Sequence, residues 1–421
     1  MRRHRGIVLA SVTVVAAAAL WTTVALIGRA HVEAAGINGG LEDVQRRAAM
    51  RSAVLVLASQ IFDQRGVLRG GGQPEIEPQI TLWESGPMAT VCRFVAFPEM
   101  GVLSAEAARL DLNIASDESL EALAPEAILL RSQGRIEDVR DLIPSLSSPV
   151  IEWTANEGGS KHLTVFAHEP NMQSSGDARI NLATPWSEEL AARILDRFGA
   201  EVVEILKEIS EEDPIRTDGD LATLLLAYSV PAEDWVEAFD AFTTDDGAMR
   251  RGRVDLNTAS AEVLAAVPGI TQEQADAIVM KRVDIGDELR ATPVWPFTEG
   301  LLPPEVVPVV MNHVTVGAWT WRATIACGEV PADDPEATLR GRMAAEVVID
   351  VAGPRPRIAS WRDITMRDAA VAWPETADSV EEESMPDEQE IREPADSPAD
   401  GSSDPPATEV PVEERLGRWL P

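Results

Sequence analysis

Basic residues are scarce in this chain. Among its 421 residues, Asp and Glu together number 70 whereas Lys and Arg number 36, which leaves a formal net charge of −34. A surface of that sign repels the phosphates of nucleic acids and anionic lipid head groups. We therefore expect no nucleic-acid partner. The hydrophobic fraction of 45% is ordinary, so the chain is able to build two or three domains with cores.

Histidine and cysteine are also rare, and catalytic motifs are missing. The five histidines show no metal-ligand spacing, and the sequence contains neither Gly-x-Ser-x-Gly nor His-Glu-x-x-His. We therefore expect a protein that is not an enzyme. The two cysteines, Cys92 and Cys327, each lie in an apolar, strand-like run. They are either buried thiols or a disulfide, and export of the folded part would favour the disulfide.

A long uncharged run occurs at the N-terminus. After the basic segment Met1–Gly6, residues 7–28 carry no charge, and about 20 apolar residues span a bilayer core. The leading arginines predict a cytoplasmic N-terminus, with the chain after Arg29 outside the cytoplasm. A plain membrane anchor is one interpretation. A cleaved secretory signal with a site near Val32–Ala34 is another.

The same residues also resemble a type IV prepilin leader. A short basic leader ends at Gly6, and an apolar helix follows directly. In such leaders a dedicated peptidase cuts after the glycine and methylates the new N-terminal residue, which here is Ile7. Most prepilins carry Glu at the fifth mature position, whereas this chain has Ser11 there.

Residues 41–62 are predicted to form a helix that follows the membrane segment. Their apolar residues recur at helical spacing (Val44, Ala48, Leu55, Ala58 and Phe62). Between the two helical stretches, residues 35–40 contain three glycines, each of which costs about 1 kcal/mol in a helix. The sequence therefore predicts a kink or a melted turn at this point.

An eight-residue motif occurs three times in the chain. The copies are Arg109–Ser116, Arg179–Trp186 and Arg253–Ser260, and the last reads Arg-Val-Asp-Leu-Asn-Thr-Ala-Ser. A leucine follows at the same offset in each copy (Leu120, Leu190 and Leu264). Recurrence of this kind indicates one supersecondary unit used repeatedly. The unit predicted here is an extended approach, a capped helix start and an apolar helix.

The third copy predicts a helix-hairpin-helix unit. Thr258 is expected to cap the first helix, and Thr271–Gln274 forms a capping box for the second. Both helices have an apolar face (Val263, Leu264 and Val267; Ala275, Ile278 and Val279). The hairpin between them consists of Pro268, Gly269 and Ile270. In the second copy, Pro185 is expected at the first helical position, directly after Thr184.

Helix-hairpin-helix units commonly bind DNA through hairpin N–H groups and nearby basic side chains. Here the second helix is acidic at its start, and its basic residues are Lys281 and Arg282 at the far end. Each phosphate contact needs a positive neighbour. We therefore expect a structural or protein-binding use of the unit rather than DNA binding.

Strand-like runs lie on both sides of the repeats (80–97, 314–325, 339–351 and 358–363). Residues 65–75 read as a flexible glycine-rich linker, and the chain after about Glu375 is acidic and predicted to be disordered. Two acidic clusters lie between the second and third copies (Asp213, Asp218 and Asp220; Asp240, Asp245 and Asp246). Such carboxylates can ligate Ca²⁺, but EF-hand spacing is absent, so solvated charge is favoured.

Taken together, the chain resembles general secretion pathway protein K, the large minor pseudopilin of type II secretion systems. The leader Arg3–Leu9, the repeats and the segment Ser360–Arg362 carry this resemblance, which covers residues 1–363. It implies cleavage after Gly6 and a methylated Ile7. The resemblance also implies a reason for Ser11. In other subunits the Glu at this position neutralises the N-terminus of the subunit above. Protein K sits at the tip, so no subunit above it needs that Glu.

The resemblance further implies partners and a location. The partners would be other minor pseudopilins, the inner-membrane secretion platform and the prepilin peptidase, and the soluble part would lie in the periplasm. Some family members bind Ca²⁺ in the inserted helical domain, but no ligand residue can be matched in this chain. Two rival hypotheses stay open: an envelope-anchored, competence-type DNA-binding protein, and an adaptor whose stacked repeats bind proteins.

We therefore expect an α+β, pilin-like fold in which a large helical insertion of the SAM-like or helix-hairpin-helix type divides a small antiparallel sheet. The expected segments are a leader (1–6), a transmembrane helix (7–28), the periplasmic part of the spine helix (29–65), pilin-like strands (76–103), the helical insertion with its three repeats (104–313), C-terminal strands (314–370) and a disordered acidic tail (371–421).

Overall fold

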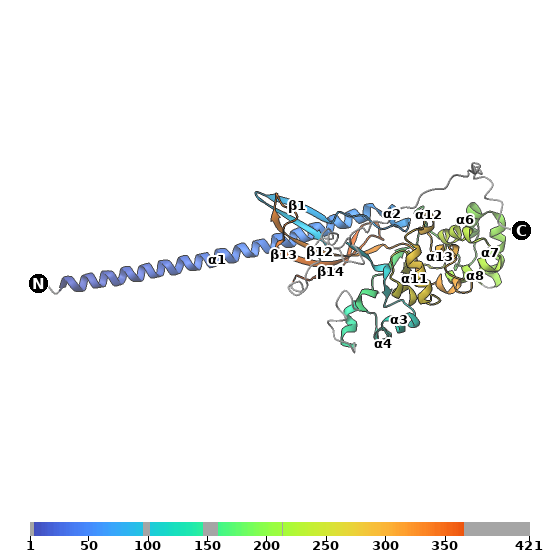
Figure 1. Ribbon diagram of the computed structural model, residues 1–421, viewed down its shortest axis with the longest axis horizontal. Helices are drawn as coiled ribbons and strands as arrows, with labels where there is room; N and C mark the ends of the chain where they lie inside the picture. The colour runs from blue at the N-terminus through green and yellow to red at the C-terminus, as the bar shows by residue number, and fades with distance from the viewer. Residues whose placement is uncertain (1–3, 96–101, 146–158, 213, 366–421) are drawn as a thin grey trace, which may run out of the picture. The chain divides into compact units, whose positions relative to one another are not determined.

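The computed structural model describes residues 4–95, 102–145, 159–212 and 214–365 (Figure 1). These residues form two compact units. The sheet unit contains residues up to 66, 74–104 and 320 onwards, and the helical unit contains 67–73 and 105–319, within those described ranges. The chain thus inserts the helical unit between strands of the sheet unit. The expected disordered tail (371–421) lies outside the described residues.

The first element is a single long helix, α1 (His4–Asp63), drawn in blue in Figure 1. Of the kink or melted turn expected at residues 35–40, the melted turn is wrong, because the backbone there is helical. Glycine weakens a helix but keeps its N–H donor, and α1 contains no proline that would remove one. The hydrogen-bonded ladder therefore continues through the three glycines.

The N-terminal part of α1 is long and apolar enough to cross a membrane. The segment that meets this test is Val12–His31, and its side chains are exposed, for example Leu20, Trp21 and Leu26. Length and composition alone support this statement, and a signal sequence would meet the same test.

The sheet unit contains a mainly antiparallel sheet. Its strand order is β1 (Gln79–Ser85), β2 (Met88–Phe94), β12 (Thr320–Pro331), β13 (Arg340–Asp350) and β14 (Arg357–Asp363), and β3 (Leu103–Ala105) also pairs with β12. Gly86 begins the two-residue turn between β1 and β2 with a φ of 61°, as a type II′ hairpin requires. The predicted mixed fold with an N-terminal apolar helix and a small antiparallel sheet is confirmed.

The C-terminal half of α1 packs against this sheet. Its buried face includes Ala53, Val54, Leu57 and Ile61, all fully buried. The predicted apolar face is largely wrong: of its five residues Ala58 is buried, whereas Val44 and Leu55 are 64% and 55% exposed. Both stripes recur at helical spacing, so periodicity alone does not tell which one faces the sheet.

The two cysteines lie opposite each other on neighbouring strands. Cys92 on β2 is paired in register with Cys327 on β12, and the structure joins them in a disulfide. Both residues are fully buried between hydrophobic neighbours. The bridge links two strands that are 235 residues apart in sequence, on either side of the helical insertion.

The helical unit consists of three copies of one frame. Each copy begins with a two-residue strand that pairs in parallel with a two-residue strand at its end: β4 (Leu110–Asp111) with β5 (Leu163–Thr164), β7 (Ile180–Asn181) with β8 (Phe242–Thr243), and β10 (Val254–Asp255) with β11 (Val314–Thr315). The linkers between copies pair as β6 (His168–Pro170) with β9 (Met249–Arg251).

Along the chain, short helices lie between the two paired strands of each copy. The first copy contains α3 (Asp117–Leu123) and α4 (Glu126–Gln133). The second copy contains α6 (Glu188–Phe198), α7 (Ala200–Glu212), α8 (Asp218–Ala227) and α9 (Trp235–Ala241). The third copy contains α10 (Ala261–Ala265), α11 (Gln272–Lys281), α12 (Asp287–Arg290), α13 (Trp295–Thr298) and α14 (Val307–Val310). Their apolar faces form one continuous core, which includes the fully buried Trp235 and Trp295.

Candidate functional site

The three motif copies make the same backbone contacts, so the repeat found in the sequence is a structural one. In each copy the N–H of the central leucine donates to the carbonyl oxygen of a threonine in the closing strand, at 2.9 Å (Leu112 to Thr164, Leu182 to Thr243, Leu256 to Thr315). The side chain before that leucine accepts from the N–H two residues later (Asp111, Asn181 and Asp255). This is an Asx turn, which ends the strand and starts the helical segment.

The helix caps follow these turns, at positions other than those predicted. Ser116, Ser187 and Ser260 cap α3, α6 and α10 by accepting an N–H three residues later. The predicted cap Thr258 instead donates to the Asp255 carboxylate at 2.5 Å. Pro185 is not at the first helical position, because α6 begins at Glu188. The Asx turn occupies the residues before each serine, so the helices start later than their sequences suggest.

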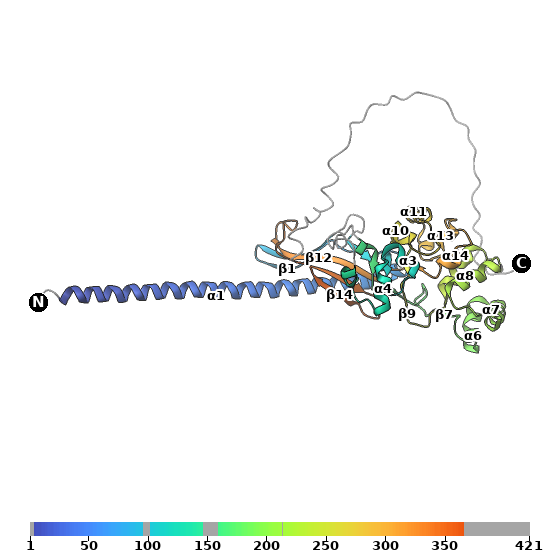
Figure 2. The same ribbon diagram turned by 90° about the horizontal axis from the view of Figure 1, so that it is seen from below.

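The hairpin of the third copy has the geometry that its sequence predicts. Thr271 forms the predicted capping box with Gln274 at the start of α11, while Pro268 and Ile270 are buried. Gly269 has a φ of 88°, and a Cβ added there would lie 3.2 Å from a methyl carbon of Val310. Figure 2 shows α10 and α11, the two helices of this hairpin, next to each other. The glycine is required by the turn, and it also packs closely against α14.

Both basic residues near this hairpin are engaged within the helical unit. The Lys281 ammonium forms an ion pair with Glu299 at 2.7 Å. The Arg282 guanidinium donates to the carbonyl oxygen of Ala259 at 2.6 Å, and Arg131 makes the matching contact to Ala115 in the first copy. Arg282 therefore fastens the second helix to the motif rather than projecting toward a phosphate.

A buried cluster of charges brings the copies together and was not predicted. Arg250, in the linker strand β9, forms ion pairs with Asp218 of α8 and with Glu169 of β6, the latter at 3.6 Å. Arg253 adds an ion pair to Asp218 at 2.8 Å. Burial disfavours the charged form of Asp218, yet the guanidinium groups of Arg253 and Arg250 hold its pKa below the ordinary value.

Of the arginines that begin the motif copies, Arg253 belongs to this cluster, whereas Arg109 pairs with Glu106 at 2.8 Å. Arg253 contacts the Met311 carbonyl oxygen, and Arg109 makes the corresponding contact to Lys161. Arg179 of the second copy has two buried guanidinium nitrogens without a hydrogen-bond partner, and burial lowers its pKa to about 10. A charged residue repeated beside an apolar strand indicates a buried structural role, but the acidic partner of Arg253 comes from a distant segment, α8.

The motif carboxylates of the first and third copies are strongly affected by burial. It raises the pKa of Asp111 and of Asp255 to about 6. The hydrogen bonds that each carboxylate accepts partly oppose this increase. Asn181 takes the same place in the second copy, so the turn needs an acceptor there and not a charge.

The acidic clusters considered for Ca²⁺ have protein partners. Asp218 pairs with arginines, Asp220 belongs to the capping box of α8, and Asp240 pairs with Arg197 at 3.3 Å. Asp246 accepts from Asn181 at 2.6 Å, and Asp213 lies outside the described residues. Within the described ranges, the structure places no group of three or more His, Cys, Asp or Glu side chains that could hold a metal ion.

The predicted processing residues lie at the start of α1. Gly6, Ile7 and Ser11 all have helical backbone. Cleavage after Gly6 and methylation of Ile7 stay predictions, because neither depends on a contact that the structure describes.

Comparison with known proteins identifies one of the repeats. Residues 250–287, which include the third motif copy, its hairpin and α11, match the family model of the helix-hairpin-helix motif. No curated protein matches the chain. The helix-hairpin-helix predicted in the third copy is thereby confirmed, and the match leaves the function of the whole chain open.

Proposed function

We propose that this protein is a non-enzymatic, membrane-anchored subunit of the minor pseudopilin type, related in role to general secretion pathway protein K. The observation that carries the proposal is the arrangement around α1. One helix extends without interruption from the candidate membrane span to an antiparallel sheet, and a large helical unit is inserted between strands of that sheet. A spine helix, a small sheet and an inserted helical domain are the parts expected of such a subunit.

Two further features support an assembly role outside the cytoplasm. The basic leader before residue 7 favours translocation of the rest of the chain. The disulfide between Cys92 and Cys327 suits an oxidising compartment, such as the bacterial periplasm. In this proposal the sheet unit and the helical unit are periplasmic, and the N-terminal helix is held in the inner membrane.

Ser11 supports a position at the tip of a pseudopilus. An uncompensated N-terminal amine is costly in a membrane interior, so a neighbouring carboxylate would be needed to neutralise it. A subunit with Ser11 offers no such carboxylate to a subunit above it. The N-terminal amine of the Ser11 subunit can still be neutralised by the carboxylate of a subunit below. Such a subunit therefore suits the uppermost position in the pseudopilus.

Isolation of the assembled complex tests this proposal. The full-length protein should co-purify with two or more smaller subunits that carry similar leaders. A photo-crosslinker at Val44 or Ala48, which are exposed, should capture them, whereas the same probe at the buried Ala53 should not. Ser11→Glu should leave the fold unchanged. Recovery of the protein evenly along purified fibres would contradict the tip position.

The helix-hairpin-helix match favours duplex DNA binding as a second candidate function. Backbone N–H groups of such a hairpin can contact a phosphate. Against it stand the net charge of −34, the exposed Glu273 and Asp276 on α11, and the engagement of Lys281 and Arg282 within the unit. We therefore place DNA binding second.

A further inference from the structure

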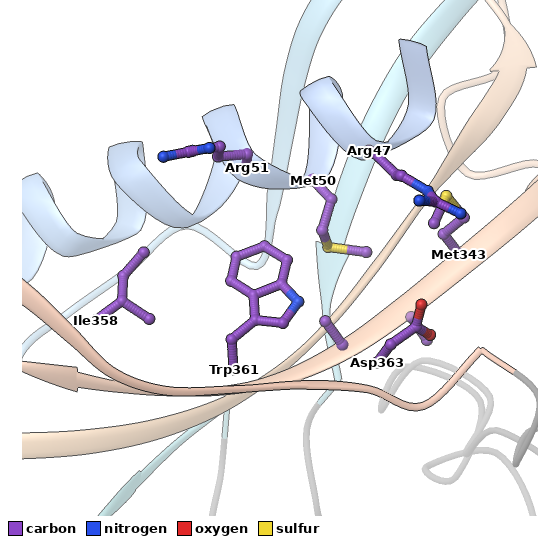
Figure 3. Close-up of a pocket in the computed structure, with 9 residues that line it drawn as sticks. Arg47, Met50, Arg51, Met343, Ile358, Trp361 and Asp363 are labelled. Carbon is purple, nitrogen blue, oxygen red and sulfur yellow. The ribbon is translucent and has the colours of Figure 1, made fainter. Parts of the chain in front are cut away.

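The sheet unit has a groove between α1 and the edge strand β14. The groove has a volume of about 520 Å³ and is open to solvent. Met50 of α1 and Met343 of β13 contribute apolar surface to it, as do Ile358 and Trp361 of β14. Figure 3 shows the Trp361 ring standing between the strand and the helix, close to Met50.

A register shift in β14 brings its two large apolar side chains to the same groove. Residues three apart on a regular strand point to opposite faces. Here Trp361 pairs with Val347 and Ile358 with Ile349, and the pairing is irregular between Val348 and Ile349. A local irregularity of this kind reorients side chains. It leaves Trp361 42% exposed at the end of the sheet.

Two arginines of α1 border the groove. Arg51 is exposed and has no carboxylate partner among the described residues. Arg47 pairs with Asp43 at 3.6 Å while its side chain stays 71% exposed, and Asp363 of β14 points toward it in Figure 3. A ligand that fits must therefore offer a large apolar side chain to Trp361 and negative charge to the arginines.

The distance along α1 excludes membrane lipid as this ligand. Arg47 is 16 residues beyond His31, where the candidate membrane span ends. At a rise of 1.5 Å per residue, the groove begins about 24 Å further along the helix than the end of the span. Lipid head groups at the membrane surface do not extend that far.

We propose that the groove binds the beginning of the chain's own acidic C-terminal segment, residues 371–383. This segment has Val371 and Trp373 followed by Glu375, Asp378 and three consecutive glutamates, so it offers both of the required chemistries. It begins eight residues after Asp363, which itself lines the groove. A short tether gives an effective concentration on the order of millimolar, which favours this segment over a peptide from another molecule.

Hydroxyl-radical footprinting of the full-length protein in detergent tests the proposal. Trp361 and Trp83 are 42% and 40% exposed in the same unit, so Trp83 serves as the internal reference. If residues 371–383 cover the groove, Trp361 should be oxidised at least about threefold more slowly than Trp83. A chain ended after Thr365 should bring the two rates together.

A charge variant tests whether the tail protects Trp361 by binding in the groove or by a general effect on the protein. Arg51→Glu should raise Trp361 oxidation as the truncation does, because it repels the glutamates. Gln45→Glu places the added charge on another exposed position of α1 and should leave the ratio unchanged. Equal oxidation of Trp361 and Trp83 in the intact chain would overturn the proposal. The proposal would also be overturned if Trp361 stayed protected after truncation, or if its protection depended on protein concentration. Either result would indicate a second molecule in the groove.

Discussion

Asp111 and Asp255 occupy the same turn position in the first and third copies, and Asn181 occupies it in the second. All three side chains accept the N–H two residues later, so the amide performs the structural task of the carboxylate. The carboxylates add an electrostatic cost, because burial raises the pKa of Asp255 from 3.8 to about 6. Burial thus disfavours the ionised form, and in the folded state the carboxyl stays mostly neutral up to about pH 6.

This difference predicts a pH effect for Asp255→Asn. Because the folded pKa exceeds the unfolded value, the stability that Asp255 contributes is full below pH 4 and is lost as the pH rises through 6. The loss is at most about 3 kcal/mol, at 1.36 kcal/mol per pH unit. Relative to wild type, Asp255→Asn should therefore be more stable at pH 7.5 and should lose that advantage toward pH 4.

Thermal unfolding of the full-length protein between pH 4 and 7.5 measures this effect. Asp276→Asn is the matched control, because it removes the same charge from an exposed position on α11. An identical pH dependence for wild type and Asp255→Asn would show that Asp255 is ionised in the folded protein at no cost.

At the scale of elements, the hairpin between α10 and α11 keeps the turn of a helix-hairpin-helix unit, while its basic side chains make contacts within the unit. Its turn is intact, with Gly269 in the required conformation. Its basic residues, however, hold the unit together, since Lys281 binds Glu299 and Arg282 binds Ala259. The start of α11 is acidic instead, which suits a protein contact better than a phosphate contact.

The hairpin should therefore not bind duplex DNA. In a mobility-shift assay with the full-length protein at physiological salt, we expect no retardation up to about 100 µM, where non-specific binders with constants of about 10⁻⁴–10⁻⁶ M are retarded. Retardation at micromolar protein that weakens with salt, and is lost in both Gly269→Glu and Lys281→Gln, would favour the DNA-binding candidate. Lys281→Gln removes one charge without straining the turn, so it controls for misfolding of Gly269→Glu.

For the whole molecule, the order of the parts along the chain has a consequence for assembly. The strands of the sheet come from both sides of the helical insertion, and the disulfide joins them. The sheet unit can therefore be completed only after the helical unit, which precedes β12, β13 and β14 in the chain, has been synthesised. Both units would reach the periplasm on one anchor, the N-terminal part of α1, in the function proposed above.

Processing of that anchor distinguishes a pseudopilin from an ordinary exported protein. Mass spectrometry of the mature protein should find a methylated Ile7 at the N-terminus. Gly6→Leu should leave the leader attached, because a bulky side chain at the cleavage position blocks the peptidase, whereas Ser11→Ala should be processed normally. An N-terminus near Ala35 would instead identify a cleaved secretory signal and remove the basis for a pseudopilin.

The sequence by itself determined the features that depend on neighbouring residues. The long apolar helix, the strands of the small sheet, the repeated motif and the hairpin with its capping box all follow from local spacing and local hydrogen bonds. Tertiary structure decided which apolar stripe of α1 is buried, since two stripes had the same period. It also brought Asp218 of the second copy and Glu169 of the linker strand β6 to Arg250. These contacts join residues far apart in the chain, so they depend on how whole elements pack and leave no mark in the local pattern.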